Sequence, residues 1–343
     1  MAPQARKKSR QGAERAGAAE AAVVEGVTIT HPERVLDLEQ GLTKLELARY
    51  YERVARRMLP HLADRPLSLV RCPMGTAKPC FYQKHAGFTV PKSVRRVWIR
   101  ERTKTAEYLV VDDAPALVAL VQAGVLEFHT WNSRASAIER PDRVVFDLDP
   151  GPDVTWERVA RAARLVKEIL ERSRLRSFVK TTGGKGLHVV VPLAPVEGWE
   201  AALAFARAVA GEIEAQEPAA FTTEMSKAKR RGKILLDVMR NARGATSVAA
   251  FSTRARPGAP VSLPLDWDAL DAPSTLTAPG VLERLPARRS DPWAGYALER
   301  QPLPAAVGPP RRGAVPASFP SSPGSGDGSG AARSSGECVK TAA

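Results

Sequence analysis

Apolar residues recur near the start of the chain with the spacing of an amphipathic helix. Thr43 and Glu46 stand in front of this pattern in the positions of a capping box, which predicts that the helix begins there. Pro60 is predicted to end the helix, because proline has no amide hydrogen to donate to the backbone ladder. The apolar positions of the helix are Leu47, Tyr50, Tyr51, Val54 and Met58.

Short runs rich in β-branched and aromatic residues follow, each bounded by Pro, Gly or charged turns. This pattern is typical of an antiparallel sheet. The predicted strands are residues 67–73, 80–85, 94–101, 107–111 and 125–131.

A second half of the chain begins with the apolar strand 144–150. Helical spacing of apolar residues follows from Trp156 to Leu170 and again from Ala202 to Ile213. The succession of elements predicts a mixed α+β fold with two sheet-bearing halves. The other strands of this half are predicted at 177–182, 187–193, 234–240 and 247–254.

Composition separates a folded unit from two tails. Residues 1–25 show no helical or strand period and are predicted to be a disordered basic arm, and residues 301–343 a disordered tail rich in Pro, Gly and Ser. The folded unit is therefore predicted at residues 26–300. Of all 343 residues 44% are hydrophobic, which is enough for a sizeable core.

Charge and cysteine content narrow the function classes. The chain has 51 Lys and Arg against 37 Asp and Glu, a formal net charge of +14, which favours a polyanionic partner, although basic chains also arise for solubility. No stretch has the length of a membrane span or the pattern of a secretory signal, so a cytoplasmic protein is expected. Cys72, Cys80 and Cys338 are too few for a disulfide framework, and we expect reduced thiols and no structural zinc.

Acidic residues within apolar strands are the strongest chemical signal. Asp147 and Asp149 alternate with apolar residues, so both side chains point to one face of a strand. Asp237 interrupts another apolar run, where an unpaired charge would be costly. Three such carboxylates suit Mg²⁺ or Mn²⁺, and two ions held this way could promote phosphoryl transfer. The alternative is a pair of exposed acids at the end of a strand.

A Gly-rich turn at Thr182–Gly186 is a candidate phosphate site. Its glycines allow an anion to approach the backbone, and Thr182, Lys185 and His188 supply donors. The spacing is not that of a Walker A loop, and an ordinary hairpin is the alternative. Four arginines that suit phosphate recognition, or simply form a solvated basic face, follow Asp237. They are Arg240, Arg243, Arg254 and Arg256.

Other candidates are weaker when taken alone. The basic run 227–233 is interpreted as a mobile, solvated loop. Phe81 could stack on a base or belong to the core, and His129, which shares a strand face with Glu127, could serve the site or be structural.

In combination, these motifs resemble the polymerase (primase-like) domain of bacterial ATP-dependent DNA ligase D, in the archaeo-eukaryotic primase superfamily. The resemblance extends from about Val27 to Leu270 and implies two subdomains with an RRM-like catalytic core and an active site between them. The matching stretches are residues 30–36, 41–51, 65–73, 80–85, 125–134, 142–152, 177–193, 230–241 and 247–270.

The resemblance also implies roles, position by position. The metal-binding carboxylates correspond to Asp147, Asp149 and Asp237, and the nucleotide pocket includes His129. The residues implied around the triphosphate are Thr182, Lys185, His188 and Arg254, with Arg240 nearby. Those implied at the DNA break are Arg34 and Lys44, which hold a downstream 5′-phosphate, and Phe81, which lies against the bases.

This chain departs from the family pattern at several of these positions. Thr182 replaces a serine and keeps the hydroxyl, Arg34 replaces a commoner lysine, and Asp37-Leu38 replace an aromatic-proline pair. The implied activity is template-directed DNA/RNA polymerisation that fills gaps and extends 3′ ends in non-homologous end joining. Its substrates would be NTPs, preferred over dNTPs, and its cofactors two divalent cations, Mn²⁺ or Mg²⁺.

Partners and rival functions complete the hypothesis. The resemblance implies a Ku-type partner and a nucleoid-associated protein. The chain lacks a K-x-D-G adenylation motif, so we expect a stand-alone polymerase that works with a separate ATP-dependent ligase. No membrane partner is expected. The alternatives are a primase that starts strands de novo, a non-catalytic DNA end-binding scaffold and a two-metal nuclease.

Overall fold

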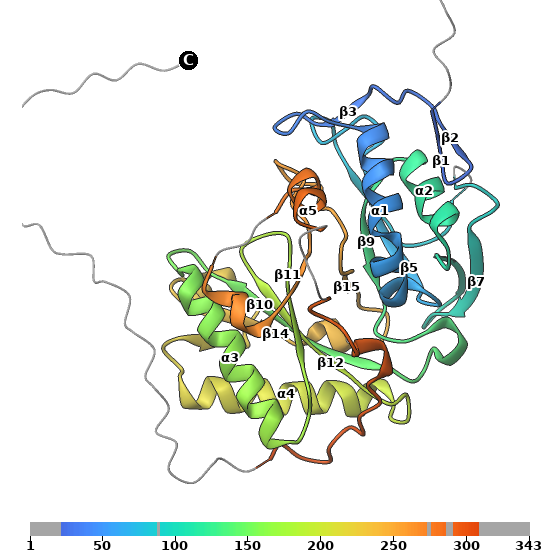
Figure 1. The fold of residues 1–343 in the computed structure, drawn as a ribbon. Helices are drawn as coiled ribbons and strands as arrows, with labels where there is room; N and C mark the ends of the chain where they lie inside the picture. Colours follow the sequence, from blue (N-terminus) through green and yellow to red (C-terminus); the bar gives the residue numbers. More distant parts are fainter. Residues whose placement is uncertain (1–21, 88–89, 273–275, 286–290, 309–343) are drawn as a thin grey trace, which may run out of the picture.

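Two β-sheets lie side by side, each covered by its own helices (Figure 1). A computed structural model of the protein describes residues 22–87, 90–272, 276–285 and 291–308. The predicted α+β class with two sheet-bearing halves is confirmed. Residues 1–21 and 309–343, which include most of both predicted tails, lie outside the described residues.

The first half contains an antiparallel sheet, as the alternation of apolar residues predicted. Its strand order is β15-β9-β5-β8-β7, and β6 pairs with β5. Its strands are β5 (Leu67–Arg71), β6 (Phe81–Gln83), β7 (Arg95–Arg100), β8 (Thr105–Val110), β9 (Val125–Thr130) and β15 (Ser247–Val248). The helices α1 (Lys44–Leu62) and α2 (Ala114–Gln122) pack against each other beside this sheet (Figure 1).

The second half contains a sheet in the order β13-β14-β10-β12-β11-β16. Neighbouring strands are antiparallel except β13 and β14, which are parallel. Its strands are β10 (Arg143–Pro150), β11 (Phe178–Thr181), β12 (Leu187–Pro192), β13 (Phe221–Thr222), β14 (Ile234–Asp237) and β16 (Pro264–Leu265). The helices α3 (Trp156–Arg172) and α4 (Trp199–Gln216) cover one face of it (Figure 1).

Smaller elements complete the fold. They are β1 (Ala22–Val24), β2 (Val27–Ile29), β3 (Val35–Asp37), β4 (Leu42–Thr43) and α5 (Ala278–Arg284), with 3₁₀ turns at Ala135–Ala137, Lys227–Arg230, Met239–Asn241, Trp267–Asp271 and Tyr296–Leu298. β1 begins inside the predicted N-terminal arm, because its residues pair with β2. Among the described residues, no helix has the length and apolar character needed to cross a bilayer.

The capping box of α1 is confirmed, but the predicted end of the helix is wrong. The Thr43 hydroxyl accepts a hydrogen bond from the Glu46 amide at 3.2 Å, and the Glu46 carboxylate accepts one from the Thr43 amide at 2.8 Å. The helix continues through Pro60 to Leu62. A proline this close to the end of a helix removes only one hydrogen bond, and burial of His61 and Leu62 stabilises the last turn.

The last predicted strand is shorter than its sequence pattern. Only Ser247–Val248 of the run 247–254 forms a strand, and it joins the first sheet beside β9 rather than the second. The chain then turns away, and Phe251 and Thr253 bind α1 instead. The hydroxyl of Tyr50 donates to the Phe251 carbonyl oxygen at 2.8 Å, and the hydroxyls of Tyr51 and Thr253 lie 2.9 Å apart. These contacts hold the segment that follows β15 against α1.

The expectation of reduced thiols is wrong for two of the three cysteines. Cys72 and Cys80 form a disulfide, with their Cα atoms 4.5 Å apart. The reason is strand register: β5 and β6 pair Arg71 with Phe81, so Cys72 and Cys80 occupy the next opposed positions. Composition alone could not reveal this pairing. Cys338 lies outside the described residues.

Candidate active site

Three aspartates lie on one face of the second sheet. Asp147 of β10 and Asp237 of β14 are directly opposed partners in the antiparallel register, and Asp149 follows two residues after Asp147. Opposed side chains lie on the same face, and so do residues two apart on a strand. The alternation in the sequence predicted the pairing of Asp147 with Asp149, whereas Asp237 joins them only through the register of β10 with β14.

Arginines neutralise these carboxylates. Arg240 Nε lies 3.1 Å from Asp147 Oδ2 and 3.3 Å from Asp237 Oδ2, and an Arg230 guanidinium nitrogen lies 3.0 Å from Asp149 Oδ2. Among the described residues, no three His, Cys, Asp or Glu side chains are gathered around a common metal position. The donor chemistry nevertheless fits Mg²⁺ or Mn²⁺, because both prefer carboxylate oxygens.

The two carboxylates of β10 have different electrostatic environments. Burial by itself would raise the pKa of Asp147, but His188 and Arg240 outweigh it and hold that pKa below its usual value. The pKa of Asp149 is raised, first by burial and then by the negative charge of Asp147. Asp147 is therefore the more firmly ionised of the pair.

The Gly-rich turn borders a cleft next to the aspartates. The turn joins β11 to β12 as a hairpin, closed by the Thr182 amide donating to the Gly186 carbonyl oxygen at 3.1 Å. A side chain at Gly186 would place its Cβ 2.4 Å from the Leu148 carbonyl oxygen, so only glycine allows the turn to pack this close to β10. The cleft has a volume of about 290 Å³, and Lys185 is exposed at its edge.

Both halves of the molecule contribute to this cleft. His129 and residues 246–248 come from the first sheet, while the aspartates and the Gly-rich turn come from the second. Of the candidates named from the sequence, those lining the cleft are His129, Asp147, Asp149, Thr182, Lys185, His188, Arg240, Arg254 and Arg256. Asp237 lies behind Arg240, in contact with its guanidinium.

Comparison with known proteins agrees with this arrangement. The family described as "LigD, primase-polymerase domain" matches residues 43–293, which include all the residues of the cleft. The chain belongs to this LigD primase-polymerase family.

Individual LigD proteins are similar over the same region. The multifunctional non-homologous end joining protein LigD of Pseudomonas aeruginosa is 40% identical over 296 residues, which cover 85% of this chain and 35% of that protein. The bifunctional LigD of Bacillus subtilis is 28% identical over 264 residues, covering 75% of this chain and 42% of that protein. This chain therefore spans about a third of the first and less than half of the second.

A solved LigD structure has the same fold. The polymerase domain of Mycobacterium tuberculosis ligase D, solved in complex with DNA, superposes with a TM-score of 0.75 at 33% identity. The match covers 80% of this chain and 99% of that one. The family resemblance inferred from the sequence motifs is thus confirmed.

Glu127, which sequence reasoning did not select, contacts two residues that line the cleft. Its carboxylate lies 2.7 Å from His129 Nε2 and 3.0 Å from Arg254 Nε, and it accepts the Ala255 amide at 2.7 Å. These partners outweigh burial and lower the pKa of Glu127 to about 2. The available signal was that Glu127 and His129 share a strand face, but only the fold brings Arg254 to the pair.

A buried lysine lies on the same sheet face as Asp147, since Lys180 is opposed to His188 and His188 to Asp147 in the strand register. Lys180 of β11 is buried, and its ammonium donates to the Ser262 hydroxyl at 2.6 Å. Burial, followed by the positive charge of Lys180, lowers the pKa of His188 to about 4. His188 Nε2 lies 3.3 Å from Asp147 Oδ1, so His188 is held as a neutral imidazole beside the carboxylate.

Two basic residues do not behave as the sequence suggested. Arg230 belongs to the run interpreted as a solvated loop, yet it contacts Asp149, and its side chain is only 16% exposed. Arg243 lies outside the cleft, because its guanidinium binds Glu139 at 2.5 Å and covers the Trp131 ring. In both cases a carboxylate that is distant in the sequence determines where the arginine side chain lies, and the spacing of residues along the chain does not reveal that contact.

The candidates for the DNA break form a separate group outside the cleft. Arg34 donates to the Pro73 carbonyl oxygen at 2.9 Å, and Lys44 donates to the Thr30 carbonyl oxygen at 3.0 Å. Burial, followed by the charge of Arg34, lowers the pKa of Lys44, so these two cations are near neighbours. Among the described residues, no carboxylate forms an ion pair with Arg34 or Lys44. An anion such as a phosphate could therefore bind to both of them. We call Arg34 and Lys44 the cation pair.

Proposed function

We propose that this chain is a template-directed nucleotidyltransferase that extends 3′ ends at gaps and breaks in DNA. The observation that carries the proposal is the cleft in which Asp147 and Asp149 of β10 lie beside the donors of the Gly-rich turn, with Asp237 of β14 directly opposite Asp147 in the strand register. Carboxylates suit the cations of phosphoryl transfer, and the opposing donors suit a triphosphate. The family membership and the polymerase-domain neighbour support this reading.

The cleft residues would bind and orient the nucleotide. Lys185 and Arg254 would neutralise triphosphate oxygens, and the Thr182 hydroxyl would donate a hydrogen bond to one of them. His129, fixed by Glu127, would hold the nucleotide from the side of the first sheet. With its phosphates held from both sheets, the nucleotide would be oriented for attack by the 3′-hydroxyl on the α-phosphorus.

Asp147, Asp149 and Asp237 would hold divalent cations. When bound, these cations, Mg²⁺ or Mn²⁺, supply charge neutralisation of the pyrophosphate and a lower pKa for the 3′-hydroxyl. Arg240 contacts both Asp147 and Asp237 and would remain beside the phosphates as a further positive charge.

Several finer parts of the hypothesis rest on the family alone. The similar proteins are named for non-homologous end joining, which is the pathway that we propose for this chain. A preference for ribonucleotides, a Ku-type partner and a partner ligase activity belong to the same proposal. The cation pair would bind the 5′-phosphate on the downstream side of the gap, and Phe81, which is 47% exposed, would stack against a base.

The test is single-nucleotide addition to a gapped DNA that carries a downstream 5′-phosphate. Each NTP and dNTP is supplied with Mn²⁺ or Mg²⁺, and the wild type is compared with Asp149→Asn. The matched control is Asp153→Asn, an exposed aspartate four residues along the chain. We expect templated addition by the wild type and the control, and a loss of about 100-fold in Asp149→Asn, as for other preorganised electrostatic contacts.

Other outcomes would support the alternatives. Equal DNA binding without extension by any variant would favour an end-binding scaffold. Synthesis on a single-stranded template without a primer would favour a primase. Strand cleavage that depends on Asp149 and the cation would favour a nuclease.

A further inference from the structure

The disulfide closes a short loop that lies against the cation pair. We call residues 73–79, between Cys72 and Cys80, the disulfide loop. Its first residue, Pro73, supplies the carbonyl oxygen that holds the Arg34 guanidinium at 2.9 Å. The direction of the Arg34 side chain is therefore coupled to the conformation of this loop.

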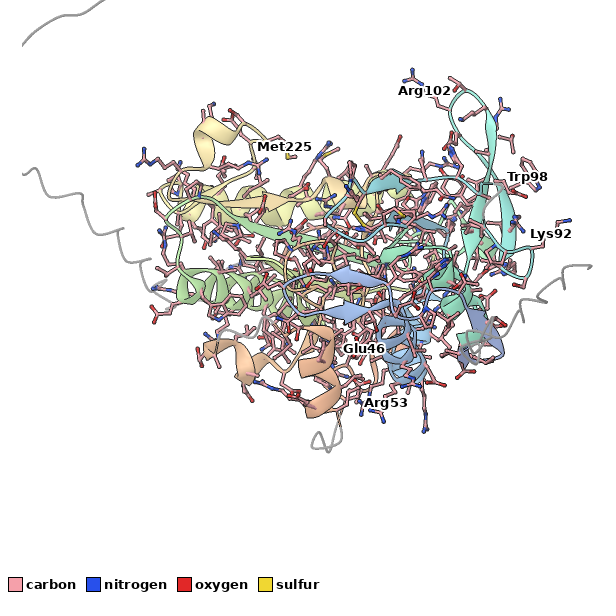
Figure 2. All side chains as sticks on the ribbon, turned by 90° about the horizontal axis from the view of Figure 1, so that it is seen from above. Glu46, Arg53, Lys92, Trp98, Arg102 and Met225 are labelled. Atoms are coloured by element: carbon pink, nitrogen blue, oxygen red, sulfur yellow. A yellow bond between two sulfur atoms is a disulfide. The ribbon has the colours of Figure 1, made fainter. Side chains whose placement is uncertain are left out.

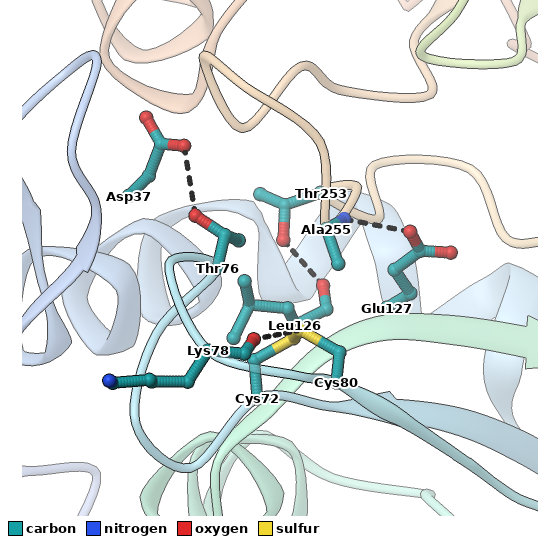
Figure 3. The surroundings of a disulfide bond; sticks show 9 residues. All are labelled: Asp37, Cys72, Thr76, Lys78, Cys80, Leu126, Glu127, Thr253 and Ala255. Atoms are coloured by element: carbon teal, nitrogen blue, oxygen red, sulfur yellow. Dashed lines mark hydrogen bonds between the residues drawn. A yellow bond between two sulfur atoms is a disulfide. The ribbon is translucent and has the colours of Figure 1, made fainter. Parts of the chain in front are cut away.

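The same loop is fixed to the strand that follows Arg34. The Thr76 amide donates to the Leu36 carbonyl oxygen at 2.7 Å, and the Thr76 hydroxyl lies 3.4 Å from Asp37 Oδ2 (Figure 3). Gly75 has a φ of +81°, and a Cβ there would lie 2.8 Å from the Val35 carbonyl oxygen.

The other end of the loop leads directly to Phe81. Cys80 precedes it, and the Arg71 guanidinium carbon lies 5.3 Å from the centre of the Phe81 ring. Arg71 Nε is in turn held by the Ala123 carbonyl oxygen at 3.0 Å. The disulfide thus joins the two ends of a segment that orients Arg34 at one end and Phe81 at the other.

We propose that the Cys72–Cys80 disulfide is a positioning element for recognition of the downstream 5′-phosphate, and that its reduction weakens this recognition. This inference rests on the proposed function. With the bond intact, the loop holds Arg34 and Phe81 in fixed relative positions, so a DNA end meets a preorganised site. Without it, binding must also order the loop, which costs affinity.

Nucleotide addition itself should not depend on this bond. The disulfide lies near Leu126 and Glu127 of β9 (Figure 3), but the contacts that hold the Glu127 carboxylate come from His129, Arg254 and Ala255. No residue of the disulfide loop lines the nucleotide cleft. Loss of the bond therefore acts on the DNA end and leaves the nucleotide site in place.

The bond can be opened by ordinary thiol–disulfide exchange. Cys72 is fully buried, whereas Cys80 is partly exposed, so an external thiolate would attack the Cys80 sulfur. Cys72 leaves as a thiolate and takes up a proton, and a second thiol releases Cys80. In balance, two small-molecule thiols become one disulfide as both cysteines become thiols. A small-molecule disulfide drives the reverse reaction.

The experiment measures discrimination between gapped DNAs that carry a 5′-phosphate or a 5′-hydroxyl. All proteins carry Cys338→Ser, so that Cys72 and Cys80 are the remaining thiols of the chain. The protein is used oxidised, reduced with dithiothreitol, and as Cys80→Ser. KM for the DNA, KM for the nucleotide and kcat are determined for each, and mass spectrometry after alkylation counts the free thiols.

For the oxidised protein we expect a clear preference for the 5′-phosphate. For the reduced protein and for Cys80→Ser, KM for the phosphorylated DNA should rise about tenfold, a typical cost of ordering a flexible segment. The nucleotide KM and kcat should stay the same, and KM for the 5′-hydroxyl DNA should rise less than KM for the phosphorylated DNA, because Phe81 contacts either end but Arg34 contacts only the phosphate. Reoxidation with glutathione disulfide should restore the preference of the reduced protein and have no effect on Cys80→Ser.

The possible failures can be told apart. Equal discrimination in the oxidised and reduced states overturns the inference and leaves the proposed function intact. A parallel loss of nucleotide affinity would show a general structural role instead of a positioning role. Absence of extension in every state would overturn the proposed function itself.

Discussion

At the scale of single residues, Glu127 is the acceptor shared by two side chains that line the cleft and by one backbone amide. His129, Arg254 and the Ala255 amide all contact its carboxylate, and its side chain is only 6% exposed. Removal of this negative charge would deprive both His129 and Arg254 of their carboxylate partner. Glu127 thus links His129 and Arg254, to which the family resemblance gives roles in nucleotide binding. The resemblance gave no role to Glu127 itself.

Replacing Glu127 by Gln should weaken nucleotide binding more than it slows the chemistry. The amide keeps the shape of the side chain but leaves Arg254 without its ion pair in a buried place, which costs about 1–3 kcal/mol. We expect the nucleotide KM to rise about tenfold or more with a smaller change in kcat. Steady-state kinetics at saturating gapped DNA measure both constants, and Glu52→Gln on the exposed face of α1 is the control. An unchanged KM would show that Glu127 does not position these residues.

At the scale of elements, the last turn of α1 connects the two halves of the fold. His61 packs edge-on against Trp293 and Tyr296, with ring centroids 5.1 Å apart in each case. The Trp293 indole nitrogen donates to the Val179 carbonyl oxygen of β11 at 2.9 Å. Helix α1, the segment near the end of the described chain and the second sheet therefore form one continuous packing unit.

Because His61 is buried in this contact, the free energy of unfolding should depend on pH. Burial, followed by the charges of Arg143 and Arg65, lowers the pKa of His61 from 6.5 to about 3. Below pH 6.5 the unfolded chain takes up a proton at this histidine while the folded chain does not, so the free energy of unfolding falls as the pH falls. From pH 7 to pH 5 this contribution is about 2 kcal/mol.

His61→Gln tests that contribution, because glutamine does not titrate. Urea unfolding gives the free energy of unfolding at pH 7 and at pH 5. Its decrease between the two pH values should be about 2 kcal/mol smaller in the variant than in the wild type. The control is His31→Gln, because His31 is exposed. If His61→Gln and the wild type lost the same amount, the buried neutral state of His61 would be refuted.

At the scale of the whole molecule, the chain carries a formal net charge of +14, and its cleft combines the carboxylates of Asp147 and Asp149 with several cationic side chains. Figure 2 shows Arg53 of α1 and Met225 on opposite sides of the molecule. Met225 belongs to the segment of Arg230, whose guanidinium contacts both the Met225 carbonyl oxygen and Asp149. Arg53 therefore lies on the side away from the carboxylates, and its charge is not expected to contact DNA bound there.

The salt dependence of DNA binding should distinguish Arg34, which is proposed to contact a phosphate, from Arg53, which is not. The affinity for gapped DNA should fall with increasing salt, because each neutralised phosphate releases a counterion. Arg34→Ala should lower the magnitude of the slope of log K against log salt by about 0.9, the value for one lost phosphate contact. Arg53→Ala removes the same charge and should leave the slope unchanged. Fluorescence anisotropy with a 5′-phosphorylated gapped duplex measures both slopes, and equal slopes would rule out a phosphate contact by Arg34.

The amino-acid sequence by itself determined what depends on local patterns. Alternation of apolar residues predicted most strands and placed Asp147 and Asp149 on one face, and the capping box gave the start of α1. The order and spacing of the motifs were enough to indicate the family. These features depend on residues that are neighbours along the chain.

Only the tertiary structure decided which distant residues meet. The register of β10 with β14 brings Asp237 opposite Asp147, and the register of β5 with β6 brings Cys72 to Cys80. The end of the predicted strand at 247–254 was wrong because Phe251 and Thr253 bind α1 instead of continuing a ladder. Register and long-range packing arise from burial summed over the whole molecule, and no local pattern contains that sum.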